Sequence, residues 1–217
     1  MKRGVGRPKK NVLSRRLILE AGLALIDEHG AEGAGMRAVA KRLGVRPSAL
    51  YNHVSGQAEL IAGVRELVSN RISTEAFDRL PWDEALMEWA RLYRVAFAAH
   101  PSTIALLAVV PIEGAGATSL MYDRVVSGMV RAGWDESKVL VAIVALESFI
   151  LGSALDSSAP DDMMKPHADA GATAFVNAYR ARENALHTRG VRPADASFEF
   201  GLRAIVSGFK AEFDASR

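Results

Sequence analysis

The chain has 217 residues, 49% of them hydrophobic, and a formal net charge of +2 at pH 7, which suits one large domain or two smaller ones with buried cores. It contains no cysteine, which excludes disulfides and thiolate metal sites. The basic first ten residues argue against a secretory signal, and no run of about eighteen apolar residues suggests a membrane span, so we expect a soluble, cytoplasmic protein.

The net charge conceals an uneven distribution along the chain. Residues 1–65 contain 12 Lys and Arg against 5 Asp and Glu, which gives +7, whereas residues 66–217 contain 15 against 20, which gives −5. A small basic segment joined to a mildly acidic one predicts that only the first part binds a polyanion.

Residues 1–11 are too polar, and too interrupted by glycine and proline, to pack as an element, and we predict a mobile basic arm. Arg7 lies between Gly6 and Pro8, a thin segment that fits a narrow A·T-rich minor groove or neutralises phosphates. The alternative is a solubilising tail without DNA contacts.

Residues 12–57 have the pattern of a three-helix domain. Ser14 is a suitable N-cap for the first helix, which Gly30 would close. The second helix begins at Met36, has one apolar stripe and ends at Gly44, and the third begins at once with Pro47 in its first turn. A short helix pair joined by so tight a turn predicts a helix-turn-helix, although a small bundle without a ligand has the same pattern.

A long fourth helix is expected from about residue 55 to residue 80, with Ser55 as N-cap and Pro81 as its end. Some 24 residues would span roughly 36 Å. Such a helix would link the basic domain to a second domain, residues 58–217.

The second domain is helical in pattern throughout, which makes the whole chain all-α. Helices are expected at residues 81–99, 102–110, 118–132, 135–155, 170–187 and 193–214. The helix at 135–155 is apolar nearly all round and the helix at 193–214 has surplus apolar surface, which favours a homodimer through these two helices. A monomer with an enlarged core is the alternative.

Several of these segments resemble the tetracycline-repressor (TetR) family of transcriptional regulators. The segments MRAVAKRLGV, SALYNHV and SGQAEL, within residues 12–65, are similar to its DNA-binding domain. LESFILGSALD and FEFGLRAIVSGFKAEF resemble the C-terminal domain of the tetracycline repressors proper. The resemblance implies a dimer that binds a double-stranded, roughly palindromic DNA operator and encloses a pocket for a small-molecule effector.

The same resemblance assigns the DNA contacts. The N-terminal end of the second helix of the pair would meet base edges, and residues behind it would bind phosphates. Many family members carry a lysine where Gln57 stands here, so we expect a weaker phosphate contact at that point. The expected DNA-binding residues, besides Arg7, are Arg37, Arg46, Pro47, Ser48, Ala49, Tyr51, Asn52, His53 and Gln57.

An apolar effector pocket is expected between the middle helices, although each of its residues also fits an ordinary core position. His100 would lie at a helix end near the last carbonyls rather than bind a metal. The pocket candidates are Trp89, Tyr93, Phe97, Leu106, Val110, Met121 and Phe149, with Glu147, Ser148 and His100 as scarce polar groups.

Tetracycline repressors use a histidine and a threonine near the short middle helix to hold a magnesium–drug complex. Here that stretch is IALLAVVP, which offers only aliphatic residues and proline. We therefore expect no metal, no tetracycline binding and a mainly hydrophobic effector.

Other function classes fit the sequence less well. An enzyme is disfavoured because the chain has no GxSxG elbow, no phosphate-binding loop and no histidine pair at metal spacing. The predicted function is a ligand-responsive repressor that needs no cofactor and meets no membrane. The alternative is a DNA-binding helical protein without an effector, architectural or controlled by a partner.

Overall fold

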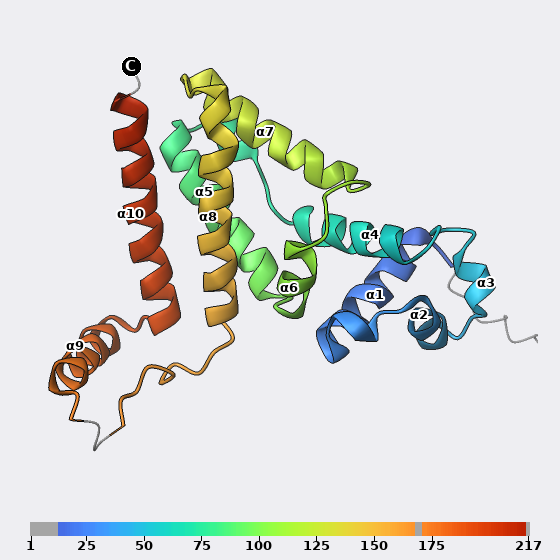
Figure 1. Cartoon of the computed structure of the whole chain (residues 1–217), viewed down its shortest axis with the longest axis horizontal. Coiled ribbons are helices and arrows are strands. Elements are labelled where there is room, and N and C mark those ends of the chain that lie inside the picture. Colours follow the sequence, from blue (N-terminus) through green and yellow to red (C-terminus); the bar gives the residue numbers. More distant parts are fainter. Residues whose placement is uncertain (1–12, 168–170, 216–217) are drawn as a thin grey trace, which may run out of the picture.

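The computed structural model describes residues 13–167 and 171–215, and within them every regular element is a helix. A small bundle of three helices lies at one end of the molecule and a larger bundle at the other, with α4 (Gln57–Ser69) between them (Figure 1). The expected all-α fold with a small N-terminal and a larger C-terminal part is confirmed.

The N-terminal bundle contains α1 (Arg15–His29), the 3-10 turn η1 (Ala31–Gly33), α2 (Met36–Leu43) and α3 (Pro47–Leu50). Its helix ends follow local chemistry. The Ser14 hydroxyl accepts a hydrogen bond from the backbone N–H of Leu17 at 3.3 Å, and Gly44 ends α2 in the left-handed region at φ 66°. The turn between α2 and α3 is therefore as tight as predicted.

The fourth helix is shorter than predicted. It begins after Gly56 and ends at Ser69, so its 13 residues span about 20 Å instead of roughly 36 Å. Ile72 continues the apolar spacing and is buried, but it reaches the core from a turn that leads to the 3-10 element η2 (Glu75–Asp78). The expected helix over residues 55–80 is therefore wrong beyond residue 69.

The N-terminus of α4 is also capped differently from the prediction. The Ser55 side chain does not cap it; instead the Glu59 carboxylate accepts a hydrogen bond from the Ser55 backbone N–H at 2.7 Å. That hydrogen bond lowers the pKa of Glu59.

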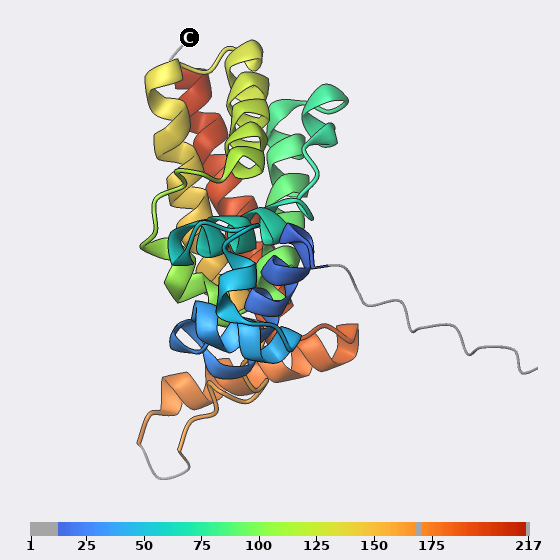
Figure 2. The ribbon, with the colours of Figure 1, turned by 90° about the vertical axis from the view of Figure 1, so that its right-hand side faces the viewer.

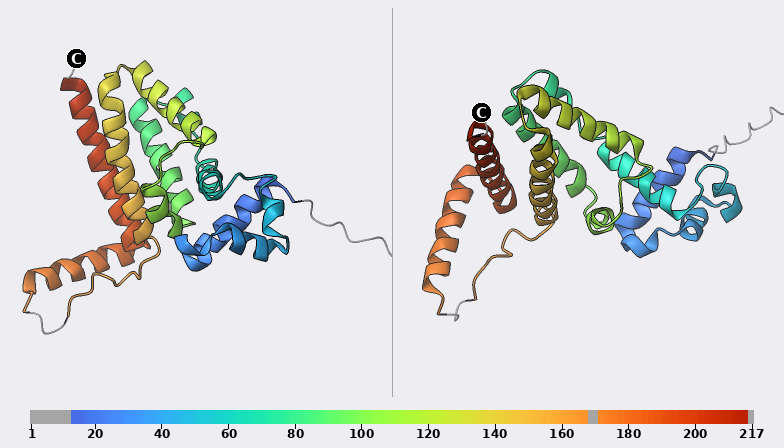
Figure 3. Two further views of the ribbon diagram at one scale, coloured as in Figure 1. Left: turned by 45° about the vertical axis from the view of Figure 1, so that its right-hand side comes forward. Right: turned by 45° about the horizontal axis from the view of Figure 1, so that its top comes forward.

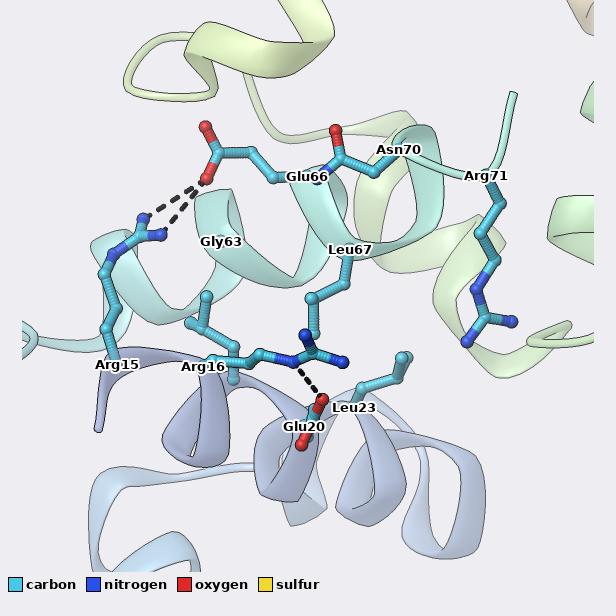
Figure 4. A pocket seen from close by; sticks show the side chains of 10 residues that line it. Arg15, Arg16, Glu20, Leu23, Gly63, Glu66, Leu67, Asn70 and Arg71 are labelled. Carbon is cyan, nitrogen blue, oxygen red and sulfur yellow. Dashed lines mark hydrogen bonds and ion pairs between the residues drawn. The ribbon is translucent and has the colours of Figure 1, made fainter. Parts of the chain in front are cut away.

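Helices α1 and α4 cross at very short range, because two glycines face two leucines. A Cβ atom on Gly63 would lie 2.4 Å from Leu19 Cδ2, and one on Gly22 would lie 2.9 Å from Leu60 Cδ1. Figure 4 shows the same two helices joined at their edge, where Arg15 donates to Glu66 at 3.3 Å. A displacement of α4 would therefore carry α1 with it.

The C-terminal bundle is formed by α5 (Trp82–Ala98), α6 (Ser102–Ala108), α7 (Gly116–Ala132), α8 (Glu136–Asp156), α9 (Thr173–Arg189) and α10 (Pro193–Ala215). Helices α8 and α10 lie side by side, and α5 packs against both of them (Figures 1 and 3). The core between them includes five fully buried residues: Leu86, Trp89, Leu146, Ile150 and Leu202.

Helix α8 is long and apolar enough to cross a membrane by length and composition, with 21 residues and a mean hydropathy of 2.0 in its most apolar window. A stretch of this kind is not expected from the sequence, because Glu136, Lys138 and Glu147 interrupt the apolar run. In this fold α8 packs against α5, α7 and α10, as the core helix of a helical bundle does.

Helix α9 is polar and leaves the bundle (Figures 1 and 2). Leu186 is the one buried residue of this helix, whose main contacts are with α10. It therefore contributes little to the core of its own chain.

Candidate DNA interface and effector cavity

The predicted base-reading residues lie together at the tip of the N-terminal bundle. Arg46 precedes α3, and Pro47 begins it. Leu50 and Val54 of the same segment are buried against the bundle, so the other side faces outward. Along that side Arg37, Arg46, Pro47, Ser48, Tyr51 and Asn52 are exposed, and Ala49 and His53 are half-buried.

Two arginines at this tip are free to bind DNA. Among the residues that the structure describes, no ion pair or hydrogen bond engages the side chain of Arg37 or Arg46. Arg42, by contrast, forms a two-pronged ion pair with Glu28 at 2.7 and 2.9 Å, which lowers the pKa of Glu28. Arg42 is therefore occupied within the protein.

Gln57 has an internal partner. Its Nε2 donates to the backbone carbonyl of Ala34 at 3.1 Å, in the loop before α2. This hydrogen bond fastens the beginning of α4 to the segment that carries Arg37, so part of the amide is engaged before DNA arrives. Arg7, the remaining DNA-contact candidate, lies outside the described residues.

Two concave sites are candidates for the effector site. A groove of about 570 Å³ lies between α1 and α4, but four of its polar side chains already pair with one another, Arg16 with Glu20 at 2.7 Å and Arg15 with Glu66 (Figure 4). A cavity of about 480 Å³ lies between α4, α5, α6, α7 and α8, and its walls are mainly apolar. Because ligand sites are mostly apolar with a few placed polar groups, the second is the better candidate.

Five of the residues expected in the pocket line this cavity. They are Tyr93, Phe97, Val110, Glu147 and Ser148.

The other pocket candidates lie elsewhere. Trp89 is fully buried in the core and packs edge-on against Tyr93, while Phe149 stacks on Phe198 of α10 with ring centres 5.7 Å apart. Met121 faces another groove beside α7, and Leu106 is a half-buried residue packed against the core.

His100 joins two helices instead of facing the cavity. Its Nε2 lies 2.9 Å from Arg71 Nη1 and its Nδ1 lies 2.8 Å from Asp27 Oδ2. Since a guanidinium can only donate, Nε2 is the acceptor and Nδ1 donates to Asp27. The imidazole therefore connects α1 to the turn that follows α4. Among the described residues, no group of three or more His, Cys, Asp or Glu is placed to hold a metal ion.

The cavity also holds two polar residues that the sequence did not suggest, Arg65 and Tyr122. Arg65 Nη2 donates to the carbonyl of Leu107 at 2.7 Å and to that of Val110. The Tyr122 hydroxyl donates to Glu147 Oε1 at 2.5 Å, while burial raises the pKa of Glu147. The available signal for Arg65 was its position between Ile61 and Val68, on the apolar stripe of its helix.

Helix α4 connects this cavity with the DNA-binding end. Glu66, next to Arg65, accepts from Arg15 of α1 and from the backbone N–H of Ala117 at the start of α7 at 3.3 Å. The Thr118 hydroxyl donates to Ser69 at 3.1 Å in a buried hydrogen bond. A change at the cavity wall can therefore reach α1 through a short series of direct contacts.

A second exposed surface lies on α8 and α10. Its residues follow one another at intervals of three or four, which places each set on one side of its helix. Gly152 and Gly208 lie within the two sets, and a Cβ atom on either would meet nothing within 4 Å. We call this surface the bundle face; it consists of Val141, Ala145, Ser148, Gly152 and Leu155 on α8 and Phe200, Ala204, Gly208 and Ala211 on α10, all exposed.

Comparison with known families gives two matches that cover most of the chain. Residues 18–64 match the family described as "Bacterial regulatory proteins, tetR family", and residues 78–213 match the "Tetracyclin repressor-like, C-terminal domain". The boundary between the two matches falls around α4 and the turn that follows it.

Individual relatives match over most of their own length. An HTH-type transcriptional regulator of Saccharopolyspora erythraea is 25% identical, with 93% of this chain and 86% of that protein covered. The class E tetracycline repressor of Escherichia coli is 23% identical, with 92% of each covered. Apo ActR from Streptomyces coelicolor, a solved structure, shares the fold at a TM-score of 0.74 and 21% identity, with 98% of this chain and all 100% of ActR covered.

Proposed function

Because the chain belongs to the bacterial tetR regulatory family and has its tetracyclin-repressor-like C-terminal domain, we propose that it is a homodimeric repressor that a small, mainly hydrophobic effector releases from a palindromic operator. A DNA-binding, ligand-responsive transcriptional regulator is what the family match establishes. The observation that carries the proposal is α4, which lines the apolar cavity with Arg65 and holds the DNA-binding bundle through Glu66 and Gln57.

For DNA recognition, the exposed tip of α2 and α3 would enter the major groove. Arg37, Arg46 and Ser48 would donate hydrogen bonds to base edges, while Pro47 and Ala49 offer apolar contact. Asn52 would add to this base readout, while Tyr51 and His53 would bind the phosphate backbone beside it. The exposure of this tip and the unpaired state of the two arginines support these roles.

For assembly, the bundle face would pack against the same face of a second copy. Small residues at its centre would let the helices of two copies approach closely, and Val141, Leu155 and Phe200 supply apolar area. The resulting dimer would place two recognition segments about 34 to 36 Å apart, one turn of DNA, which implies a roughly palindromic site.

For release, the effector would favour a conformer in which α4 lies differently. Because α4 and α1 are locked together by their glycine–leucine crossing, the whole tip would move and the two tips of a dimer would lose the spacing of successive grooves. The effector can do this only to the extent that it binds the two conformers unequally.

The cavity also separates this proposal from the alternative of a DNA-binding protein without an effector. That alternative fits a compact second core without a hollow, whereas about 480 Å³ lies open between five helices here. A structural neighbour, ActR of Streptomyces coelicolor, has been solved with actinorhodin, at a TM-score of 0.70 and 23% identity. We further propose that the protein is cytoplasmic and not an enzyme, since its relatives are transcriptional regulators.

The decisive experiment selects DNA fragments from a random pool with the purified protein and sequences them. We expect an inverted repeat whose half-sites lie one DNA turn apart. A protein carrying Arg37→Ala and Arg46→Ala serves as control and should enrich no motif. Enrichment of a single half-site, or of no sequence at all, would contradict the proposal.

Tetracycline is not expected to be the effector, although several relatives are tetracycline repressors. The wall formed by α6 is aliphatic, and no metal-binding group forms among the described residues. A ligand at 100 times its Kd stabilises a protein by about 2.7 kcal/mol, which a thermal-shift assay detects easily. We expect Mg²⁺ with tetracycline to leave the melting temperature unchanged, and a rise of several degrees would overturn this prediction.

A further inference from the structure

Arg65 is a buried cation that forms no ion pair within the described part of the chain. The residue is 9% exposed, and its Nε atom is buried without a hydrogen-bond partner. Among the described residues no carboxylate forms an ion pair with its guanidinium, and only the carbonyls of Leu107 and Val110 accept from Nη2. A buried charge is costly unless it is paired. Glu147 attracts this arginine across the cavity, but no ion pair or hydrogen bond joins the two among the described residues, so the guanidinium lacks a directly bound anion.

The unpaired guanidinium lies on the wall of the cavity, among residues of a different kind. Tyr93, Phe97, Ile104 and Ile143 line the same space and favour a flat, apolar molecule. We propose that the effector is a hydrophobic organic acid, an apolar ring compound whose anionic oxygen group binds Arg65; this rests on the proposed function and names the class of its ligand.

Glu147 faces the same cavity and would, taken alone, suggest a cationic ligand instead. Its Oε1 atom, however, already accepts the Tyr122 hydroxyl at 2.5 Å, so the carboxyl has a partner inside the protein. Burial also raises its pKa, which favours the neutral form. Of the two groups, Arg65 is the one that keeps a buried donor, Nε, without a hydrogen-bond partner, and this favours an acid over an amine.

The position of Arg65 also suggests how an acid would act. Its guanidinium holds the carbonyls at the C-terminal end of α6, and an anion would compete with those neutral acceptors because hydrogen bonds between charged groups are the stronger ones. The residue next to it, Glu66, connects α4 to α1 and α7. Binding the acid and loosening α4 from α6 would thus occur at one side chain.

The test uses two fluorescent probes of the same ring skeleton on the full chain: 8-anilinonaphthalene-1-sulfonate, an anion, and N-phenyl-1-naphthylamine, which lacks the sulfonate. We expect the wild-type protein to bind the anion about tenfold more tightly than the neutral probe. Arg65→Met should lower the affinity for the anion about tenfold and leave the neutral probe unchanged, while Arg65→Lys retains part of the preference. Arg124→Met, which removes an exposed arginine of α7, is the matched control and should change neither affinity.

Three results would overturn the proposal: equal affinities for the two probes, no binding of the anion at all, or equal effects of Arg65→Met on both probes. Tighter binding of the cationic dye rhodamine 6G that is lost in Glu147→Gln would assign the cavity to amines instead. If Arg65→Met fails to fold, the ratio of the wild-type protein's affinities for the two probes, together with the same ratio for Arg65→Lys, decides whether the proposal stands. Operator binding by the wild-type protein is measured in parallel, so a wrong ligand class is distinguished from a wrong function.

Discussion

Gly152→Arg is expected to convert the protein into a folded monomer that no longer holds its operator. Gly152 lies within the bundle face of α8, where an added Cβ atom would meet nothing within 4 Å. Replacing a helical glycine should even favour the helix by up to about 1 kcal/mol. In the proposed dimer, however, the arginine would place a charge where two copies meet, and dissociation should become more than about 100-fold easier, roughly 2.7 kcal/mol.

Sedimentation velocity gives the mass, circular dichroism the helix content, and fluorescence anisotropy the operator affinity. Loss of the second half-site contact should weaken DNA binding by about 10²- to 10⁴-fold. Gly152→Ala is the control: it gains the same helix propensity but remains small, so the dimer and operator binding should persist. A Gly152→Arg protein that stays dimeric would show that assembly uses another surface.

Arg37→Ala and Arg46→Ala should each weaken binding to the selected operator by about 1 to 3 kcal/mol without lowering the melting temperature. Both side chains are exposed at the tip and without partners among the described residues, so their removal costs the folded protein little. The lost free energy should depend on the base pairs at specific positions, since a guanidinium that forks onto guanine discriminates sequence.

Anisotropy titrations on the operator and on one-base variants measure this effect. Arg124→Ala, an exposed arginine far along the chain on α7, serves as the charge-matched control and should bind as the wild type does. If both tip variants retain full affinity, the DNA-binding surface lies elsewhere.

Local chemistry explains why most helix boundaries could be predicted. A hydroxyl at Ser14, a proline at 47 and glycines at 30, 44 and 133 act within one turn of the backbone, and each marks the helix end expected for it. The helix at residues 193–214 was also found within one residue of each end, because its apolar residues recur regularly and Pro193 begins it.

The end of α4 could not be predicted in this way, because apolar spacing reports burial and not helix. Ile72 is 5% exposed and lies four positions after Val68, as it would in a continuing helix, yet the chain has already turned at Asn70. Residues distant in the sequence hold that turn: His100 accepts a hydrogen bond from Arg71, and the Thr118 hydroxyl donates one to Ser69.

The sequence predicts an apolar cavity between the middle helices, and one is present there, but several of its lining residues differ from those predicted. Large apolar residues such as Trp89 and Phe149 were expected to line it, whereas they fill the core on the other sides of α5 and α8. Which side of an apolar helix lines a cavity depends on the helices packed against it, and the sequence does not show which helices these are. A charged residue on an apolar stripe, as at Arg65, is the more informative signal.

The internal ion pairs of the N-terminal bundle limit how strongly salt can affect DNA binding. Residues 13–57 contain six basic side chains, and three of them form ion pairs: Arg15 with Glu59, Arg16 with Glu20 and Arg42 with Glu28. Each phosphate neutralised by a basic side chain contributes about −0.9 to the slope of log K against log salt, through release of a condensed counterion. Because Arg37 and Arg46 are proposed to meet base edges, Lys41 is the exposed cation that the bundle keeps for phosphates in each copy. A slope much steeper than one phosphate per copy would therefore point to the basic residues among the first eleven.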